Sequence, residues 1–161
     1  MAILKTANTV GKYYDVNAKQ DVINYILKPN KMIHRYFGSI GVDQVHIAES
    51  MQRVSERFSK AKGVQLRHFI LSFYPEELHD PRTANEIGAK IIQWFGQEYQ
   101  SVYSVHEDKS YLHIHIVINS VSYIDGHRYY GTKKEFYEFK NVIRRLLSSY
   151  GIYRLEYCSN R

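Results

Sequence analysis

Three histidines stand close together in the run HEDKSYLHIHIVIN, which covers residues 106–119. Successive side chains of a β-strand point to opposite faces, so a strand over 111–121 places His113 and His115 on the same face. The residues that alternate with them form an aliphatic row suited to a core: Leu112, Ile114, Ile116 and Ile118. The spacing therefore predicts an amphipathic strand that carries two imidazoles on its polar face.

The third histidine reaches this face from a neighbouring strand. Residues 101–106 are predicted to form a strand joined to the first by the polar turn Glu107–Ser110. That turn sets His106 opposite Tyr111 and diagonally next to His113, so that three imidazoles converge. Neutral imidazoles with open positions beside them are typical of a catalytic metal site, with bonds of about 2.1 Å if the metal is zinc. The alternative is that these are surface histidines that bind nothing.

Other polar residues share the neighbourhood of this cluster. Asp108, in the turn, is suited to orienting one ring from outside the coordination sphere and fixing its tautomer. Asn119 shares the histidine face but lies about 13 Å beyond the last histidine, too far for a metal ligand. A second strand, over 65–74, carries His68 and Ser72 on one face, where they contact phosphate, orient a ligand, or are ordinary residues at a sheet margin.

The composition limits the class of protein. The 161 residues, 44% of them hydrophobic, suit a single domain with a real core, which we expect to span residues 1–161. A mean hydropathy of −0.44 and the lack of a long apolar run argue against membrane insertion, and the first residues do not resemble a secretory signal. The single cysteine, Cys158, excludes an internal disulfide framework and a multi-cysteine zinc site, which favours the cytoplasm.

Charge is distributed unevenly along the chain. The formal net charge is +6 and the isoelectric point is near 9.3. Residues 1–67 carry a net +6, residues 68–125 a net −5, and residues 126–161 a net +5. Basic flanks suit a polyanion, and an acidic, histidine-bearing middle suits a cation, although a generic basic surface would have the same count. The fifteen tyrosines suit either base stacking or half-buried sheet positions.

The elements that must position these residues alternate between strands and helices. The remaining predicted strand covers 2–9. Helices are predicted over 18–28, with a capping box of Asn17 and Gln20, and over 43–61. A third helix is predicted to start at Asp80-Pro81, and a fourth to be capped by Thr132 with Glu135 and closed by Gly151. Two strands meet through a tight turn, so they are antiparallel. The pattern predicts an α+β fold in which helices pack over an antiparallel sheet.

A metal beside a basic surface favours phosphodiester chemistry, in which water or a side chain attacks the phosphorus. Tyr25 lies about 130° from the centre of the apolar stripe of its predicted helix, and Tyr137 is similarly off the stripe of the last helix. A tyrosine hydroxyl, with an ordinary pKa of about 10, needs help from a base or a metal to attack. Each tyrosine is otherwise an exposed or DNA-stacking residue.

Three motifs together resemble a known family. HEDKSYLHIHIVIN resembles the third motif of the conjugative relaxases of the HUH endonuclease superfamily, most closely that of their MobP, VirD-like group. VINYILKPNK, around Tyr25, resembles their nucleophile motif, and RHFILSF resembles their second motif, with Ser72 as its serine. The order of the motifs agrees over roughly residues 20–150. The resemblance implies a central antiparallel sheet of about five strands whose middle pair carries the metal.

The same resemblance implies site- and strand-specific nicking of DNA at an origin of transfer, which starts the conjugative transfer of a plasmid or integrative element. Tyr25 would attack the scissile phosphate and leave a 5′-phosphotyrosine link with a free 3′-hydroxyl, which can later reseal the strand. Asp108 would support a histidine, and Ser72 would help to place the DNA. The divalent cation would be held by His106, His113 and His115.

The cofactor and partners follow from two sources. Imidazole ligands favour a late transition metal such as Zn²⁺, Ni²⁺ or Co²⁺, whereas the resemblance implies Mg²⁺ or Mn²⁺ in use. It also implies single-stranded or hairpin DNA, accessory DNA-binding proteins and a type IV secretion coupling protein as partners, and export of the protein covalently bound to DNA. Candidate DNA contacts are Lys28, Lys31, His68, Asn119, Arg128, Lys133 and Lys134.

Three other classes stay open at this point. A rolling-circle replication initiator or single-tyrosine transposase shares the histidine pair but would use a nucleophile that follows it, namely Tyr137. A histidine-metal phosphohydrolase would use water and leave no covalent adduct. A DNA-binding module without activity would be unaffected by replacement of His113 and His115 with alanine.

Overall fold

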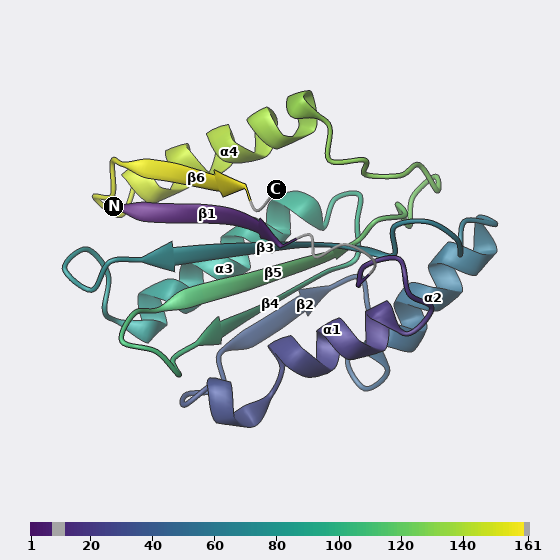
Figure 1. Ribbon diagram of the computed structural model, residues 1–161, viewed down its shortest axis with the longest axis horizontal. Helices are drawn as coiled ribbons and strands as arrows, with labels where there is room; N and C mark the ends of the chain where they lie inside the picture. The colour runs from purple at the N-terminus through teal and green to yellow at the C-terminus, as the bar shows by residue number, and fades with distance from the viewer. Residues whose placement is uncertain (8–11, 160–161) are drawn as a thin grey trace.

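A six-stranded sheet lies between two pairs of helices (Figure 1). The computed structural model describes residues 1–7 and 12–159. Its elements in chain order are β1 (Ala2–Ala7), α1 (Ala18–Ile26), the 3₁₀ turn η1 (Pro29–Lys31), β2 (Phe37–Ile40), α2 (Ile47–Arg57), β3 (Leu66–Phe73), α3 (Pro81–Phe95), β4 (Ser101–His106), β5 (His113–Asn119), α4 (Lys133–Ser148) and β6 (Leu155–Ser159). The predicted α+β class is confirmed.

The strand order is β2-β4-β5-β3-β1-β6, and every neighbouring pair is antiparallel except β1 with β6, which is parallel. The sheet has six strands rather than about five. The sequence pattern misses the two edge strands, FGSI in β2 and LEYCS in β6, because segments this short carry little alternation. The predicted opening strand over 2–9 ends at Ala7 in β1, and residues 8 and 9 lie outside the described residues.

The two faces of the sheet differ in chemistry. One face is apolar and packs against α3 and α4, through residues such as Phe69 and Leu71 of β3, Ile116 of β5 and Phe139 of α4. The other face carries the histidines and is covered by α1 and α2 through a smaller apolar cluster: Val22, Ile23, Ile26, Met51, Leu66, Val102 and Val117. Because strand residues alternate, a full apolar core on one face leaves the opposite face free for polar chemistry.

Helix boundaries differ from the predictions where local side-chain hydrogen bonds intervene. The predicted helix 43–61 is shorter, Ile47–Arg57, because the carboxylate of Asp43 accepts from two following backbone amides and holds a turn before the helix. The predicted Asn17–Gln20 capping box is wrong, since Gln20 donates instead to Asn24. The capping box of Thr132 with Glu135 and the start of α3 at Asp80-Pro81 are confirmed, and the Asp80 side chain caps α3 by accepting from the backbone amide of Arg82. Among the described residues, every helix is too short or too polar to cross a bilayer.

Gly88 lets α3 approach the middle of the sheet. A Cβ atom on this residue would lie 2.4 Å from the Cδ2 atom of the buried Tyr103 ring on β4. We expect Gly88→Ala to lower the free energy of unfolding by about 1–3 kcal/mol, measured by urea denaturation, because overpacking outweighs the better helix propensity of alanine. An unchanged or higher stability would contradict this close packing, since propensity alone predicts a gain of about 1 kcal/mol.

Candidate active site

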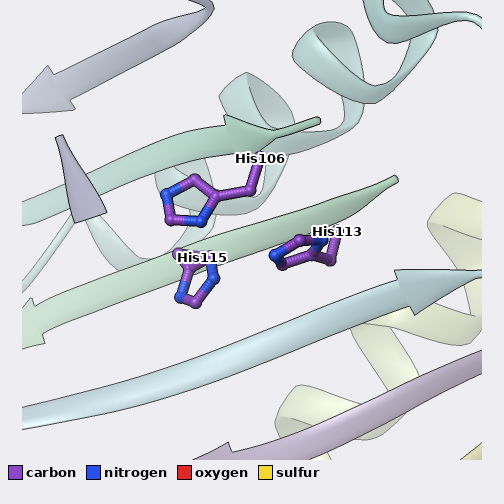
Figure 2. A group of neighbouring side chains, drawn as sticks. All are labelled: His106, His113 and His115. Carbon is purple, nitrogen blue, oxygen red and sulfur yellow. The ribbon is translucent and has the colours of Figure 1, made fainter. Parts of the chain in front are cut away.

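Strands β4 and β5 bring the three histidines together (Figure 2). His106 ends β4, His113 begins β5, and the two residues are direct cross-strand partners. The predicted pairing of His106 with Tyr111 is wrong by two residues, because the connection 107–112 is longer than the predicted turn 107–110. A shift of two residues restores the same face, so the convergence of the rings is preserved. One nitrogen of each ring lies within 4.8 Å of the others.

The three rings are buried, and two of their nitrogens are left unpaired. His106 Nε2 lies 2.8 Å from the backbone carbonyl of Ile26, at the end of α1. A carbonyl can only accept, so the proton of His106 lies on Nε2 and its Nδ1 keeps a lone pair. The buried atoms His106 Nδ1 and His115 Nε2 have no hydrogen-bond partner among the described residues. Because an unsatisfied buried nitrogen is costly, this donor set fits a divalent metal ion.

A hydrogen-bonded chain behind the cluster fixes the tautomer of His115. Its Nδ1 lies 2.7 Å from Nε2 of His68, and the Nδ1 of His68 lies 2.9 Å from the hydroxyl of Tyr13. If His115 presents the lone pair of Nε2 to a metal, its Nδ1 donates to His68, and His68 in turn donates to Tyr13. The sequence pattern places His68 on the histidine face. Tyr13 lies in a loop, and no pattern in the sequence indicates that its hydroxyl contacts His68.

We therefore expect His68→Phe, which keeps a ring but removes both nitrogens, to weaken binding of Mn²⁺ about 10- to 100-fold. The physical reason is the loss of the hydrogen bond that orients His115. Isothermal titration calorimetry measures the affinity, and thermal unfolding of the metal-free variant reports whether it is folded. His46→Ala, at an exposed histidine before α2, is the matched control. Equal Mn²⁺ affinity in both variants would show that the hydrogen bond from His68 does not orient His115 for metal binding.

Burial keeps the imidazoles neutral and able to bind a metal. Burial, followed by the charge of His106, lowers the pKa of His113 to about 4. Burial also lowers the pKa of His115 well below its ordinary value and lowers that of His106. The pKa of His68 falls to about 3, again mainly because of burial. At neutral pH these rings are therefore unprotonated on one nitrogen, as metal binding requires.

Asp108 lies beside the cluster and is held by a lysine. Its Oδ2 accepts a hydrogen bond from Lys31 Nζ at 3.0 Å, while its Oδ1 lies 3.7 Å from Nε2 of His113. Burial opposes ionisation of Asp108, but the hydrogen bond from Lys31, a backbone hydrogen bond and the nearby positive charges together outweigh it, so the pKa of the carboxyl is lowered. The distance of 3.7 Å is too long for a hydrogen bond. Asp108 is therefore a negative charge next to His113, paired with Lys31.

Tyr25 lies directly over the histidines. It is the penultimate residue of α1, and its ring centroid lies 6.0 Å from that of His106 and 5.7 Å from that of His115, both edge-on. The Nζ atoms of Lys12 and Lys31 lie 5.5 and 5.3 Å from the same centroid. Its ring stays 40% exposed while the apolar residues of α1 are buried. This is the off-stripe orientation that the helical periodicity predicts.

Tyr137 is far from this arrangement. It is exposed on α4, and α4 packs against the apolar face of the sheet through Phe139 and Ile143. The histidines lie on the other face. The structure therefore brings Tyr25, and not Tyr137, to the histidine cluster.

Ser72 lies at the margin of the cluster. It is the cross-strand partner of His113 in the pairing of β3 with β5, and it is half-buried. It also lines a hollow of about 380 Å³ together with Tyr74, Tyr111 and Lys5. The two tyrosines are partly exposed, so an aromatic surface and a lysine lie next to the histidines on the side away from α1.

The basic candidates for DNA contacts fall on different surfaces. Lys28 is exposed just after α1, and Lys31 lies beside the Tyr25 ring while its ammonium group bonds to Asp108. Lys133 and Lys134 are exposed at the start of α4, on the opposite side of the sheet. The two basic ends of the chain therefore do not meet at the histidines.

The other candidates for DNA contacts are engaged inside the protein. His68 and Asn119 are buried, with exposed fractions of 3% and 0%. The side-chain amide of Asn119 donates to the backbone oxygen of Met51 and to Gln100. Arg128 donates to three backbone carbonyls of the loop between α2 and β3. In this structure the two buried side chains have no surface that DNA can reach, and the guanidinium of Arg128 holds a loop.

A family model described as the MobA/VirD2-like relaxase, nuclease domain, matches residues 25–152, from Tyr25 through all three histidines to just past the end of α4. The chain belongs to this relaxase family. Curated relatives agree. A Staphylococcus aureus relative named Protein rlx is 36% identical over 78 residues, which is 48% of this chain and 24% of that protein. The group II intron-interrupted relaxase LtrB of Lactococcus lactis subsp. cremoris is 33% identical over 75 residues, 46% of this chain and 13% of that protein.

Two solved structures have a fold similar to that of this chain. The MobM relaxase domain, in a Mn-bound crystal structure with plasmid oriT DNA, has a TM-score of 0.56 at 13% identity and covers 96% of this chain and 88% of its own. A second structure, from a study of the molecular basis of vancomycin resistance transfer in Staphylococcus aureus, has a TM-score of 0.53 at 11% identity. The match covers 78% of this chain and 75% of that chain. By contrast, this chain spans at most about a third of each of the three rlx relatives.

Proposed function

We propose that this chain is a DNA-nicking relaxase domain in which Tyr25 cleaves one strand at an origin of transfer and remains joined to it. The observation that carries the proposal is the position of Tyr25 over His106 and His115, whose unpaired nitrogens face the same cluster. A nucleophile and a metal site that approach one another on a partly exposed surface suit an extended polyanionic substrate. The family match supports the same class of reaction.

In the proposed reaction the Tyr25 oxygen forms a bond to the scissile phosphorus as the bond from phosphorus to the 3′ oxygen breaks. The phenol loses its proton and the departing 3′ oxygen gains one, so a 5′-phosphotyrosine and a free 3′-hydroxyl result. The phosphodiester energy is kept in the new link, and the reverse attack reseals the strand. The ammonium groups of Lys12 and Lys31 beside the ring attract the phosphate.

A divalent cation bound by His106, His113 and His115 would supply Lewis-acid polarisation of a phosphate oxygen. We propose Mg²⁺ or Mn²⁺ as the ion in use, while Zn²⁺, Ni²⁺ or Co²⁺ also suits three imidazoles. The Mn-bound state of the MobM domain supports the former choice. His68 and Tyr13 orient His115, and Asp108 holds Lys31 beside the nucleophile.

The proposed DNA substrate is single-stranded or extruded hairpin DNA at an origin of transfer, by analogy with the oriT complex of MobM. Lys28, Lys31 and Ser72 are the candidate contacts that lie nearest the histidines. We further propose that residues 1–161 act as one nuclease domain in the cytoplasm, with accessory DNA-binding proteins and a type IV secretion coupling protein as partners. The match covers 24% of Protein rlx and 13% of LtrB, and the additional sequence of these longer relatives is consistent with such contacts.

The proposal is tested by incubating the protein with supercoiled origin DNA and Mg²⁺ or Mn²⁺, followed by a denaturing gel. We expect nicked DNA that carries covalently bound protein, and no nicking in EDTA. Nicking without an adduct would instead support a phosphohydrolase that uses water. Binding without nicking under any metal would support a DNA-binding module.

A further inference from the structure

A second hollow, of about 300 Å³, lies on the opposite face of the sheet from the histidines. It is formed by the end of α3, the residues that precede β4, and the first turns of α4. Tyr99 lines it two residues before β4 begins, whereas His106 ends that strand, so the two sites are separated by about 20 Å along β4. This hollow is therefore independent of the proposed nicking chemistry.

The walls of the hollow are aromatic and acidic. Trp94, Phe95, Tyr99 and Tyr129 supply ring surface, and the carboxylates come from Glu98, Glu135 and Glu138. Lysine and arginine are absent among its lining residues in the described part of the chain. Aromatic faces and carboxylates both attract cations, and they repel a polyanion such as DNA.

One buried polar group in the hollow is unsatisfied. Tyr129 is 4% exposed, and its hydroxyl has no hydrogen-bond partner among the described residues. The residue lines the hollow, and burial, followed by the charge of Glu135, raises the pKa of its hydroxyl. A buried hydroxyl without a partner costs free energy unless a ligand supplies one.

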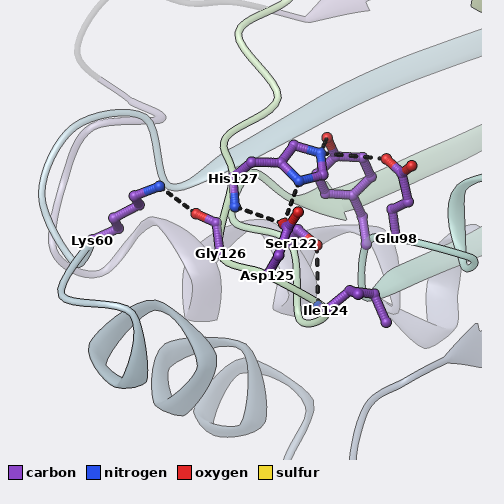
Figure 3. Close-up of polar contacts among 8 residues, drawn as sticks. Lys60, Glu98, Ser122, Ile124, Asp125, Gly126 and His127 are labelled. Carbon is purple, nitrogen blue, oxygen red and sulfur yellow. Dashed lines mark hydrogen bonds and ion pairs between the residues drawn. The ribbon is translucent and has the colours of Figure 1, made fainter.

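The wall nearest β4 is held in place by a hydrogen-bonded chain (Figure 3). The two ring nitrogens of His127 contact different partners: Nδ1 contacts the carboxylate of Asp125, and Nε2 lies 2.6 Å from the Tyr99 hydroxyl and 3.3 Å from Glu98. Lys60 holds the same loop from outside through the carbonyl of Gly126. The side chains of this wall are thus held in place without a ligand. A preformed site of this kind loses little conformational entropy when a ligand binds.

We propose that this hollow binds an arginine side chain presented by a basic segment of a partner protein. A guanidinium is planar, stacks on aromatic faces and carries five donors, which suit the ring surface, the glutamates and the free oxygen of Tyr129. Glu98 and Glu138 are exposed at the rim, so the rest of the partner stays outside while one side chain enters. A bare metal ion is disfavoured, because the histidine cluster is the one convergent ligand set among the described residues.

Trp94 provides a direct probe, because it is the single tryptophan of the protein and lines the hollow. The full chain is titrated with a capped peptide that contains three arginines separated by glycines, and with the same peptide in which citrulline replaces arginine. We expect a saturable change in tryptophan fluorescence with the arginine peptide and none with the neutral one. Glu138→Gln and Tyr129→Phe are each expected to raise the Kd about 3- to 10-fold.

The control variant is Glu76→Gln, which removes one exposed carboxylate outside the hollow and is expected to bind the arginine peptide as the unmodified chain does. Circular dichroism confirms that each variant is folded, and nicking activity is expected to stay unchanged in Glu138→Gln. Equal responses to the arginine and citrulline peptides would overturn the proposal, as would a Kd that rises equally in the Glu138 and Glu76 variants, because an equal rise would reflect general charge alone. A variant that loses peptide binding but still nicks DNA would show that the hollow binds the peptide independently of the proposed nicking reaction.

Discussion

Replacing Tyr25 with phenylalanine is expected to reduce nicking at least about 10³-fold and to eliminate the covalent protein–DNA adduct. The substitution removes the hydroxyl of Tyr25, and it leaves the ring that packs against His106 and His115 in place. Metal affinity and folding should therefore be unchanged. Gel assays of nicking, with calorimetry for Mn²⁺ binding, measure both quantities in the same preparation.

Tyr137→Phe is the matched control for the nucleophile, because it removes the same atom from an exposed tyrosine on the other side of the sheet. It is expected to nick DNA as the unmodified chain does. Tyr13→Phe should also retain the adduct, since the Tyr13 hydroxyl is bonded to His68. If Tyr137→Phe rather than Tyr25→Phe lost the adduct, the order of nucleophile and histidines would be that of rolling-circle initiators and transposases.

Replacing His115 with alanine is expected to lower Mn²⁺ affinity more than about 100-fold and to reduce nicking at least about 10²-fold. His115 contributes one of the two buried nitrogens that lack a protein partner, and it links the cluster to His68. Removing metal from the unmodified chain with EDTA should produce the same loss of nicking, and added Mn²⁺ should restore it. Calorimetry and the nicking assay give the two values.

His46→Ala again serves as the control, since it removes an exposed imidazole before α2. Full nicking by the His115 variant in the presence of EDTA would contradict a metal-assisted reaction. Unaltered Mn²⁺ affinity in that variant would instead place the metal elsewhere in the protein.

The histidine face and the nucleophile were accessible to sequence reasoning because both depend on local periodicity. Alternation along β5 places His113 and His115 on one face whatever the tertiary packing, and helical spacing turns Tyr25 away from the apolar stripe. The partner of His106 was misassigned because its identity depends on the length of the connection 107–112, which is not periodic. The predicted partner was two residues from the observed one, and a shift by an even number of residues leaves the side chains on the same face of the sheet.

What depends on tertiary packing was not accessible. The bond from Tyr13 to His68 joins a loop to a strand 55 residues away. The sequence also does not specify which face of the sheet each helix covers, so the basic residues Lys133 and Lys134 were grouped with Lys28 although α4 lies on the opposite face. For the same reason the acidic middle of the chain suggested one cation site, whereas Glu98 lines a separate hollow.

Mapping the covalent adduct tests the central claim most directly. After reaction with origin DNA, the protein is digested with nuclease and trypsin, and the peptides are analysed by mass spectrometry. Cleavage after Lys19 and Lys31 releases a peptide in which Tyr25 is the single tyrosine, because Pro29 protects the bond after Lys28. The account predicts a 5′-phosphonucleotide on this peptide. The same mass on residues 135–140, whose single tyrosine is Tyr137, or no modified peptide at all, would contradict it.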